Sequence, residues 1–231
     1  MIAQGTWRFT EEEKKTILSL LTKGRKEQER NQKFAIINFD NFYKLFSQDE
    51  ISIMKKYLAI KPEEIGYKLP YFGLVDTPVD IVPIADQTYE LELRKETIPC
   101  QYLPKRAYEA FLKLNDAMGE ELHKRVLVLY GYRSPARQVF MFFDILERIY
   151  NFDFNKTIKR VCLPAFSEHV FPEKQAIDFM TLDGIKGEGF EKTDEYTWLK
   201  ENARKFNFIE SYPLNNNLDM MYEPWHWSYN S

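Results

Sequence analysis

Hydrophobic residues recur at helical spacing in the first part of the chain. In the segment TEEEKKTILSLLTKGRKEQERNQKF (residues 10–34), Thr10 stands three positions before Glu13, which is the arrangement of a helix capping box. The segment SQDEISIMKKYLAI (residues 47–60) repeats the arrangement with Ser47 and Glu50. The pattern predicts a helical N-terminal part that extends to about residue 60 and has a packing role.

Prolines and short β-rich runs alternate between residues 61 and 104, as in KLPYFGLVDTPVDIVPIADQTYELEL. Proline lacks a backbone N–H and is confined to the edges and starts of strands. We therefore predict extended chain and loops here, with room for an edge hairpin.

Helical and strand patterns then follow one another to the end of the chain. KRAYEAFLKLNDAMGEELHK (105–124) reads as an amphipathic helix, with an apolar side formed by Tyr108, Phe111, Leu112 and the apolar residues of 114–118. RVLVLYGYR (125–133) reads as a buried strand, and SPARQVFMFFDILERIY (134–150) as a helix that starts with a serine N-cap and proline at N1. TDEYTWLKENARKFNF (193–208) predicts a last helix, and IESYPL (209–214) a strand. Because no regular βαβ repetition occurs, the fold class predicted is α+β.

Composition and charge narrow the range of partners. The chain has 231 residues, of which 44% are hydrophobic and 16% aromatic, so it can bury a substantial core. A net charge of −3 gives no electrostatic case for nucleic acid as the main partner. The sequence contains no stretch of about 18 apolar residues, so no membrane span is predicted. Cys100 and Cys162 are too few for a disulfide framework and lack zinc-ligand spacing; two core thiols and one bridge both remain open.

Histidine is rare, and its neighbours suggest a metal site. His123 lies in the charged stretch EELHKR and is expected to be solvated, whereas His169 lies in FSEHVFP and His226 in EPWHW. Asp178 stands in the apolar run AIDF, where a carboxylate needs a partner because its burial alone is costly. Two imidazoles and one carboxylate are a usual catalytic zinc set, with the fourth position left to water. A core histidine bonded to a buried acid is the competing interpretation.

Four stretches together resemble the zinc D-Ala-D-Ala carboxypeptidases of the vancomycin-resistance type, in peptidase family M15. They are VLYGYRSPARQ, PAFSEHVFPEKQAIDF, YTWLKENARKFNFIESYP and MYEPWHW, in the order in which that family carries its related motifs. The family belongs to the superfamily of lysostaphin, D-Ala-D-Ala metallopeptidases and the sonic hedgehog domain. The similarity covers roughly residues 100 to 228. It implies a small antiparallel sheet flanked by helices, here with a mainly helical N-terminal extension.

The resemblance also implies roles for individual residues. His169, Asp178 and His226 would bind one Zn²⁺, and Glu223 would be the general base that acts on water. Arg133 would stabilise the carbonyl oxygen or hold substrate charge. The other implied substrate contacts are Ser167, Gln138 and Trp225. Because strict strand geometry would put residues 223 and 226 on opposite faces, we predict a bulge or bend near Pro224.

The sequence departs from the family pattern at three places. The interval from His169 to Asp178 is two residues longer than usual and lacks a glycine, so Pro172–Lys174 is predicted to be an inserted loop. Tyr130 stands where the family has a small residue, and Ser211 replaces a frequent arginine. These differences affect the expected pocket walls more than the expected zinc chemistry.

The implied function is zinc-dependent hydrolysis of peptide bonds in bacterial cell-wall stem peptides, foremost as a D-Ala-D-Ala carboxypeptidase. The alternatives are a cell-wall endopeptidase of the same family and a zinc-containing binding domain without catalysis. The implied partner is a peptidoglycan stem peptide or a D-Ala-D-Ala-terminated precursor. The expected location is the bacterial cell envelope or periplasm; no signal peptide is visible in the sequence, so the cytoplasm also stays open.

Three regions are expected along the chain. Residues 1–60 would form the helical extension, residues 61–99 an extended segment that packs on the core, and residues 100–231 the zinc peptidase core.

Overall fold

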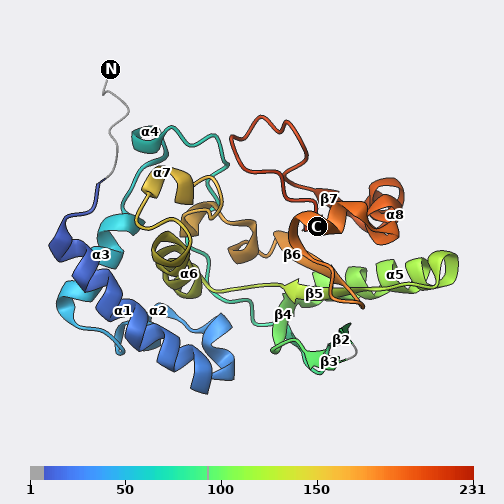
Figure 1. Ribbon diagram of the computed structural model, residues 1–231, viewed down its shortest axis with the longest axis horizontal. Helices are drawn as coiled ribbons and strands as arrows, with labels where there is room; N and C mark the ends of the chain where they lie inside the picture. The colour runs from blue at the N-terminus through green and yellow to red at the C-terminus, as the bar shows by residue number, and fades with distance from the viewer. Residues whose placement is uncertain (1–7, 93) are drawn as a thin grey trace. The chain divides into compact units, whose positions relative to one another are not determined.

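The computed structural model describes residues 8–92 and 94–231, which divide into two compact units (Figure 1). Unit 1 comprises residues 1–76, 133–170 and 217–221, and unit 2 comprises residues 77–132, 171–216 and 222–231. Helices dominate the described part of unit 1, and unit 2 combines helices with antiparallel strands. The α+β class predicted from the sequence is confirmed.

Unit 1 is built mainly from helices and short helical turns. Its elements are α1 (Glu11–Arg30), η1 (Gln32–Ile36), α2 (Phe39–Tyr43), α3 (Gln48–Leu58), α4 (Pro62–Ile65), α6 (Pro135–Arg148), α7 (Phe154–Thr157), η2 (Pro164–Phe166) and η3 (Glu168–Val170). Both predicted capping boxes are present, at Thr10 with Glu13 and at Ser47 with Glu50. Ser134 caps α6 with Pro135 in its first turn, also as predicted.

A buried carboxylate connects α1 to α3 in unit 1. Glu50, in the first turn of α3, accepts hydrogen bonds from Ser19 Oγ and Lys23 Nζ of α1, each at 2.7 Å. Its Oε2 also accepts the backbone N–H of Ser47 at 2.7 Å. The glutamate of the capping box therefore also connects the two helices. Burial acts to raise the pKa of Glu50, but the hydrogen bonds from Lys23, Ser19 and Ser47 outweigh it and hold that pKa below its ordinary value.

Unit 2 contains a sheet in which strand neighbours are not sequence neighbours. Its elements are β1 (Ile81–Ile84), β2 (Thr88–Leu91), β3 (Arg94–Thr97), β4 (Gln101–Pro104), α5 (Lys105–Leu122), β5 (Val126–Tyr130), β6 (Lys174–Thr181), η4 (Gly187–Lys192), α8 (Asp194–Asn202), η5 (Ala203–Phe206), β7 (Phe208–Glu210) and β8 (His226–Asn230). Among the described residues, the largest sheet has the strand order β5-β6-β8-β7, and every pair in it is antiparallel. The hairpin expected between residues 61 and 104 is β2–β3, and β1 pairs with β4.

One face of this sheet packs against α5 and α8. The apolar core there includes Phe111 and Leu114 of α5, Leu199 of α8 and Phe179 of β6. Leu112 was predicted to lie on the apolar side of α5, and this is wrong: its side chain is exposed. The buried positions Ala107, Phe111, Leu114 and Met118 follow the three- and four-residue spacing of one helix face, and Leu112 falls outside that series.

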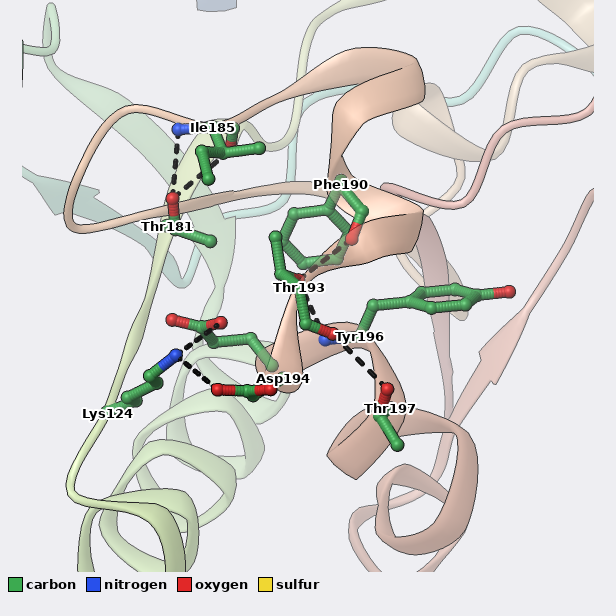
Figure 2. A network of polar contacts seen from close by, with 9 residues as sticks. Lys124, Thr181, Ile185, Phe190, Thr193, Asp194, Tyr196 and Thr197 are labelled. Atoms are coloured by element: carbon green, nitrogen blue, oxygen red, sulfur yellow. Dashed lines mark hydrogen bonds and ion pairs between the residues drawn. The ribbon is translucent and has the colours of Figure 1, made fainter.

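Polar contacts fix the start of α8, as Figure 2 shows. Thr193 caps the helix by accepting the N–H of Tyr196, and Lys124 Nζ lies 2.7 Å from Asp194 Oδ2 in the first turn. The helix ends at Asn202 and continues as the 3-10 turn η5, so the regular helix is shorter than the predicted 193–208. Strand β7 is also shorter than predicted, because the chain leaves the sheet after Glu210.

The backbone at Gly131 passes too close to β4 for a side chain. A Cβ at Gly131 would lie 2.4 Å from the carbonyl oxygen of Tyr102, and the next residue, Tyr132, donates its N–H to that same oxygen at 2.6 Å. Glycine here therefore permits β5 to turn toward Arg133 while it stays bonded to β4.

Gly131→Ala should lower the free energy of unfolding by about 1–3 kcal/mol, because the backbone contact leaves the new methyl group no room. The matched control is Gly119→Ala within α5, where the nearest atom to a new Cβ is Arg125 Nε at 3.6 Å. That control should be neutral or stabilising by up to about 1 kcal/mol. Urea unfolding of both variants measures the difference, and equal effects would contradict the steric explanation.

Glu50→Gln should lower the free energy of unfolding by about 1–3 kcal/mol at pH 7, because it removes a buried charge-assisted hydrogen-bond acceptor. Since the pKa of Glu50 is depressed in the folded state, its contribution is present above the unfolded pKa and disappears as the pH falls through the folded pKa. The difference from wild type should therefore shrink below about pH 4.5. Urea unfolding across pH measures this, with the exposed Glu29→Gln as a control that should change nothing.

Candidate metal centre and general base

Strand pairing sorts the side chains of β6 and β8 between two faces of the sheet. Asp178 on β6 is the cross-strand partner of His226 on β8, and Ile177 is the partner of Trp227. Because side chains alternate along a strand, Ile177 and Trp227 enter the apolar core while Asp178 and His226 share the opposite face. The alternation thus places a carboxylate and an imidazole next to each other on one surface of the sheet.

Asp178 and His226 form a buried pair. The distance from Asp178 Oδ1 to His226 Nδ1 is 2.9 Å, and the two residues are 7% and 4% exposed. A carboxylate with so little solvent contact needs a hydrogen-bond donor or a cation beside it. The expectation that Asp178 is buried and has a partner is confirmed.

A tight turn brings Glu223 to the same place. The N–H of His226 donates to the carbonyl of Glu223 at 3.0 Å, so residues 223–226 form a turn through Pro224 and Trp225 before β8 begins. Glu223 Oε2 lies 3.7 Å from His226 Nδ1, and the Glu223 side chain is buried. The bend predicted near Pro224 is confirmed, and it explains how residues three apart reach one site.

His169 lies in the one-turn helix η3 of unit 1. Its carbonyl accepts the N–H of Arg133 at 3.0 Å, so the backbone after β5 is tied to the segment that carries the histidine. His169 and Arg133 are both buried, as is Ser167, which lies immediately before η3. His123, in contrast, is exposed at the end of α5, as expected.

His169, Asp178 and His226 form a group that can hold a metal ion. Each offers one ligand atom, and these atoms all lie within 4.8 Å of one another. All three residues are buried. Imidazole nitrogen and carboxylate oxygen are ligands that suit zinc, whereas a calcium or magnesium site is built mainly from oxygen. The donor set therefore fits the ion that the sequence predicts, and the roles of these residues as its ligands stay a prediction.

The segment Pro172–Lys174, predicted to be an inserted loop, does not interrupt the pairing. Pro172 and Glu173 form a turn, Glu173 is exposed, and β6 begins at Lys174. The Glu173 carbonyl accepts the N–H of Ser231 at 3.2 Å, which closes the end of the β6–β8 ladder. Asp178 accordingly keeps its register with His226.

Two of the expected substrate contacts have structural partners. Gln138 in α6 is buried and donates from Nε2 to the carbonyl of Cys162 at 2.8 Å. Trp225 lies in the apolar core of unit 2, and its carbonyl accepts the N–H of Phe179 at 2.9 Å. Their roles in substrate binding, like that of Ser167, stay predictions.

Cys100 and Cys162 are both free thiols.

Sequence reasoning missed Tyr212, which touches the site twice. Its carbonyl accepts the N–H of Glu223 at 3.0 Å, and its ring centroid lies 4.8 Å from that of the His226 imidazole. Tyr212 follows β7 in the stretch IESYP, where an aromatic residue after a strand has the same signature as an ordinary core residue. A second aromatic residue beside the site is Tyr222, which directly precedes Glu223 in the chain.

The phenols of Tyr222 and Tyr196 share a partly buried network with Glu210. The two hydroxyl oxygens are 3.1 Å apart, and Tyr196 donates to Glu210 Oε1 at 2.9 Å. Burial raises the pKa of Tyr196 far above the ordinary phenol value, and its hydrogen bonds with Tyr222 and Glu210 add to that rise. Burial also raises the pKa of Tyr222. Both phenols therefore remain protonated hydrogen-bonding groups at neutral pH.

Known carboxypeptidases are similar to this chain in sequence. The family model for D-alanyl-D-alanine carboxypeptidase, VanY, matches residues 100–231. The chain is 27% identical over 213 residues to a putative carboxypeptidase, YodJ, of Bacillus subtilis (strain 168), covering 89% of this chain and 72% of that protein.

Solved structures of carboxypeptidases are also similar. The LD-carboxypeptidase LdcB is 29% identical with a TM-score of 0.52, over 66% of this chain and 68% of that one. A vancomycin-resistance D,D-pentapeptidase VanY in complex with Zn(II) is 24% identical with a TM-score of 0.48, over 63% and 79% of the two chains.

No helix in residues 8–92 and 94–231 has the length and apolar character that a membrane crossing requires.

The family match spans more than half of the sequence and contains Asp178, His226, Glu223 and His169. The chain therefore belongs to the VanY family of D-alanyl-D-alanine carboxypeptidases and is a peptidase enzyme.

Proposed function

We propose that this enzyme uses zinc to remove the terminal D-alanine from bacterial cell-wall stem peptides that end in D-Ala-D-Ala. The observation that carries the proposal is the buried group His169, Asp178 and His226, with the Glu223 carboxylate beside His226. Membership of the carboxypeptidase family supports the reaction type. The cell-wall substrate favours the bacterial envelope as the place of action.

The protein's own groups divide the work of hydrolysis. Bound zinc would supply a Lewis acid and lower the pKa of a water to about 7. We assign to Glu223 the transfer of a proton from the attacking water to the leaving amine, which a single carboxylate can do in sequence. Its burial limits competing solvent around the transferred proton.

Arg133 and the buried surroundings serve the substrate. A guanidinium presents a planar fork of N–H donors that matches a carboxylate or a developing oxyanion. We assign this role to Arg133, at the junction between the GYR turn and the cap of α6. Ser167, Gln138 and Trp225 are proposed as further substrate contacts.

A second candidate reaction is cleavage between an L- and a D-residue. The similarity to the LD-carboxypeptidase LdcB, at 29% identity, favours it over an endopeptidase. A peptide panel separates the candidates: a stem peptide ending in D-Ala-D-Ala, the shorter one ending in L-Lys-D-Ala, and one blocked at its carboxyl end. Release of D-alanine from the first alone supports our proposal, and cleavage of the blocked peptide would indicate an endopeptidase.

Removal of a predicted ligand should greatly weaken zinc binding. His226→Ala or Asp178→Ala should weaken zinc affinity by at least about 100-fold, since even partners of ligands contribute 10–100-fold. Chelation of the wild-type enzyme should stop hydrolysis, and added zinc should restore it. His123→Ala is the matched control, because this histidine is exposed at the end of α5. Full zinc content in the Asp178 and His226 variants, measured by atomic emission, would refute the assignment.

Glu223→Gln should lower kcat by about 10²–10⁴-fold, because the amide cannot accept and return the proton. Zinc content should stay at the wild-type level, since Glu223 is outside the ligand set. The control Glu173→Gln makes the same chemical change on the exposed turn before β6 and should leave the rate unchanged. Hydrolysis is followed as D-alanine release. Bound zinc with hydrolysis in neither wild type nor variant would instead indicate a binding domain.

A further inference from the structure

The segment that follows β7 contacts both functional residues of the terminal turn. Ser211 donates its N–H to the carbonyl of His226 at 3.3 Å, and the carbonyl of Tyr212 accepts the N–H of Glu223 at 3.0 Å. Ser211 Oγ also hydrogen-bonds Ser228 Oγ at 3.0 Å, one position beyond Trp227 on β8. The chain therefore leaves the sheet at Glu210 but remains bonded to the turn that carries Glu223 and His226.

The Tyr212 ring lies against the His226 imidazole. The ring centroids are 4.8 Å apart with an angle of 36° between the planes, and Tyr212 is almost completely buried. The Asp178 carboxylate meets the imidazole at Nδ1, at the ring edge. One contact at the edge and another against the ring restrict rotation about the terminal side-chain torsion, which is otherwise broad for histidine.

A second set of hydrogen bonds holds Tyr222, the residue before Glu223. The Tyr222 hydroxyl lies 3.1 Å from that of Tyr196, which donates to Glu210 Oε1. Lys200 Nζ holds the other oxygen of the same carboxylate at 2.5 Å. Glu210 and Tyr212 thus fix the chain at Tyr222 and at Glu223, so the base is held through its own backbone and through its neighbour.

We propose that Tyr212 is a positioning residue that sets the orientation of the His226 imidazole and the place of the Glu223 backbone. The inference rests on the proposed function for its kinetic consequence, but the contact between the tyrosine ring and the imidazole can be measured without catalysis. The ring carries the effect on the imidazole, and the main-chain carbonyl, which every variant retains, holds the Glu223 backbone. Phenylalanine retains the ring, so the variant Tyr212→Phe should behave like the wild-type enzyme.

The contact between the Tyr212 ring and the His226 imidazole is tested by NMR on the metal-free protein. The chain has three histidines, so the signal of His226 is assigned by its loss in His226→Gln. The ring current of Tyr212 should shift the His226 carbon-bound protons upfield relative to the exposed His123. Tyr212→Phe should retain the shift, and Tyr212→Leu should abolish it. An unchanged His226 signal in Tyr212→Leu would overturn the proposal, whether or not the enzyme hydrolyses peptides.

The kinetic test separates positioning from simple loss of stability. Tyr212→Leu should lower kcat by about 10–100-fold with KM unchanged, because small misplacements of reacting groups are costly. Phe208→Leu is the matched control: Phe208 is buried in β7 as part of the apolar core, and its ring lies against those of Tyr229 and Phe179. It should destabilise the fold but leave kcat unchanged.

Tyr212→Phe should recover the wild-type kcat. Equal losses in Tyr212→Phe and Tyr212→Leu, or a loss in Tyr212→Leu no greater than that in Phe208→Leu, would contradict the positioning role. Inactivity of the wild-type enzyme on every peptide would count against the proposed function alone, and the NMR measurement would still decide the role of Tyr212.

Discussion

The pairing of Asp178 with His226 across β6 and β8 is the interaction on which the candidate site depends. An aspartate in the middle of an apolar strand would destabilise the sheet if it had no partner. The strand register supplies that partner at 2.9 Å, and the same register sends Ile177 and Trp227 into the core. The site and the hydrophobic core therefore lie on opposite faces of the same pair of strands, and both depend on the same backbone register.

Around this pair, the chain uses short, sharply bent segments rather than long regular elements. The turn at Pro224 brings Glu223 next to His226, and η3 presents His169 with its backbone tied to Arg133. The regular helices contribute indirectly: Ser134, the residue after Arg133, caps α6, and α8 supplies the Tyr196 hydroxyl that reaches Glu210 and Tyr222. Precision at the site thus comes from main-chain hydrogen bonds in irregular regions that are anchored on either side by regular ones.

The sequence predicted those features that leave a local chemical signature. The caps at Thr10, Ser47 and Ser134 are such signatures, because each depends on a few neighbouring residues. The bend at Pro224 was predicted in another way, from the shared site that the family resemblance implies for Glu223 and His226. Asp178 could be singled out because a carboxylate contrasts with its apolar neighbours. The exposure of Leu112 and the early end of β7 could not be read in this way, because both depend on what packs against the element. Tyr212 was missed for a related reason: its importance lies in two contacts with residues far along the chain, and sequence spacing does not record them.

The alternation along β8 also limits how this protein can change. Adding or deleting a single residue between the Pro224 turn and the end of β8 would exchange the two faces of that strand. His226 would then enter the hydrophobic core, and Trp227 would lie beside Asp178. Insertions of odd length in this segment should consequently be rarer among functional descendants than substitutions. The turn at residues 172–173 comes before the first register pair, Lys174 with Asn230, so a change of length there leaves the pairing of Asp178 with His226 in place.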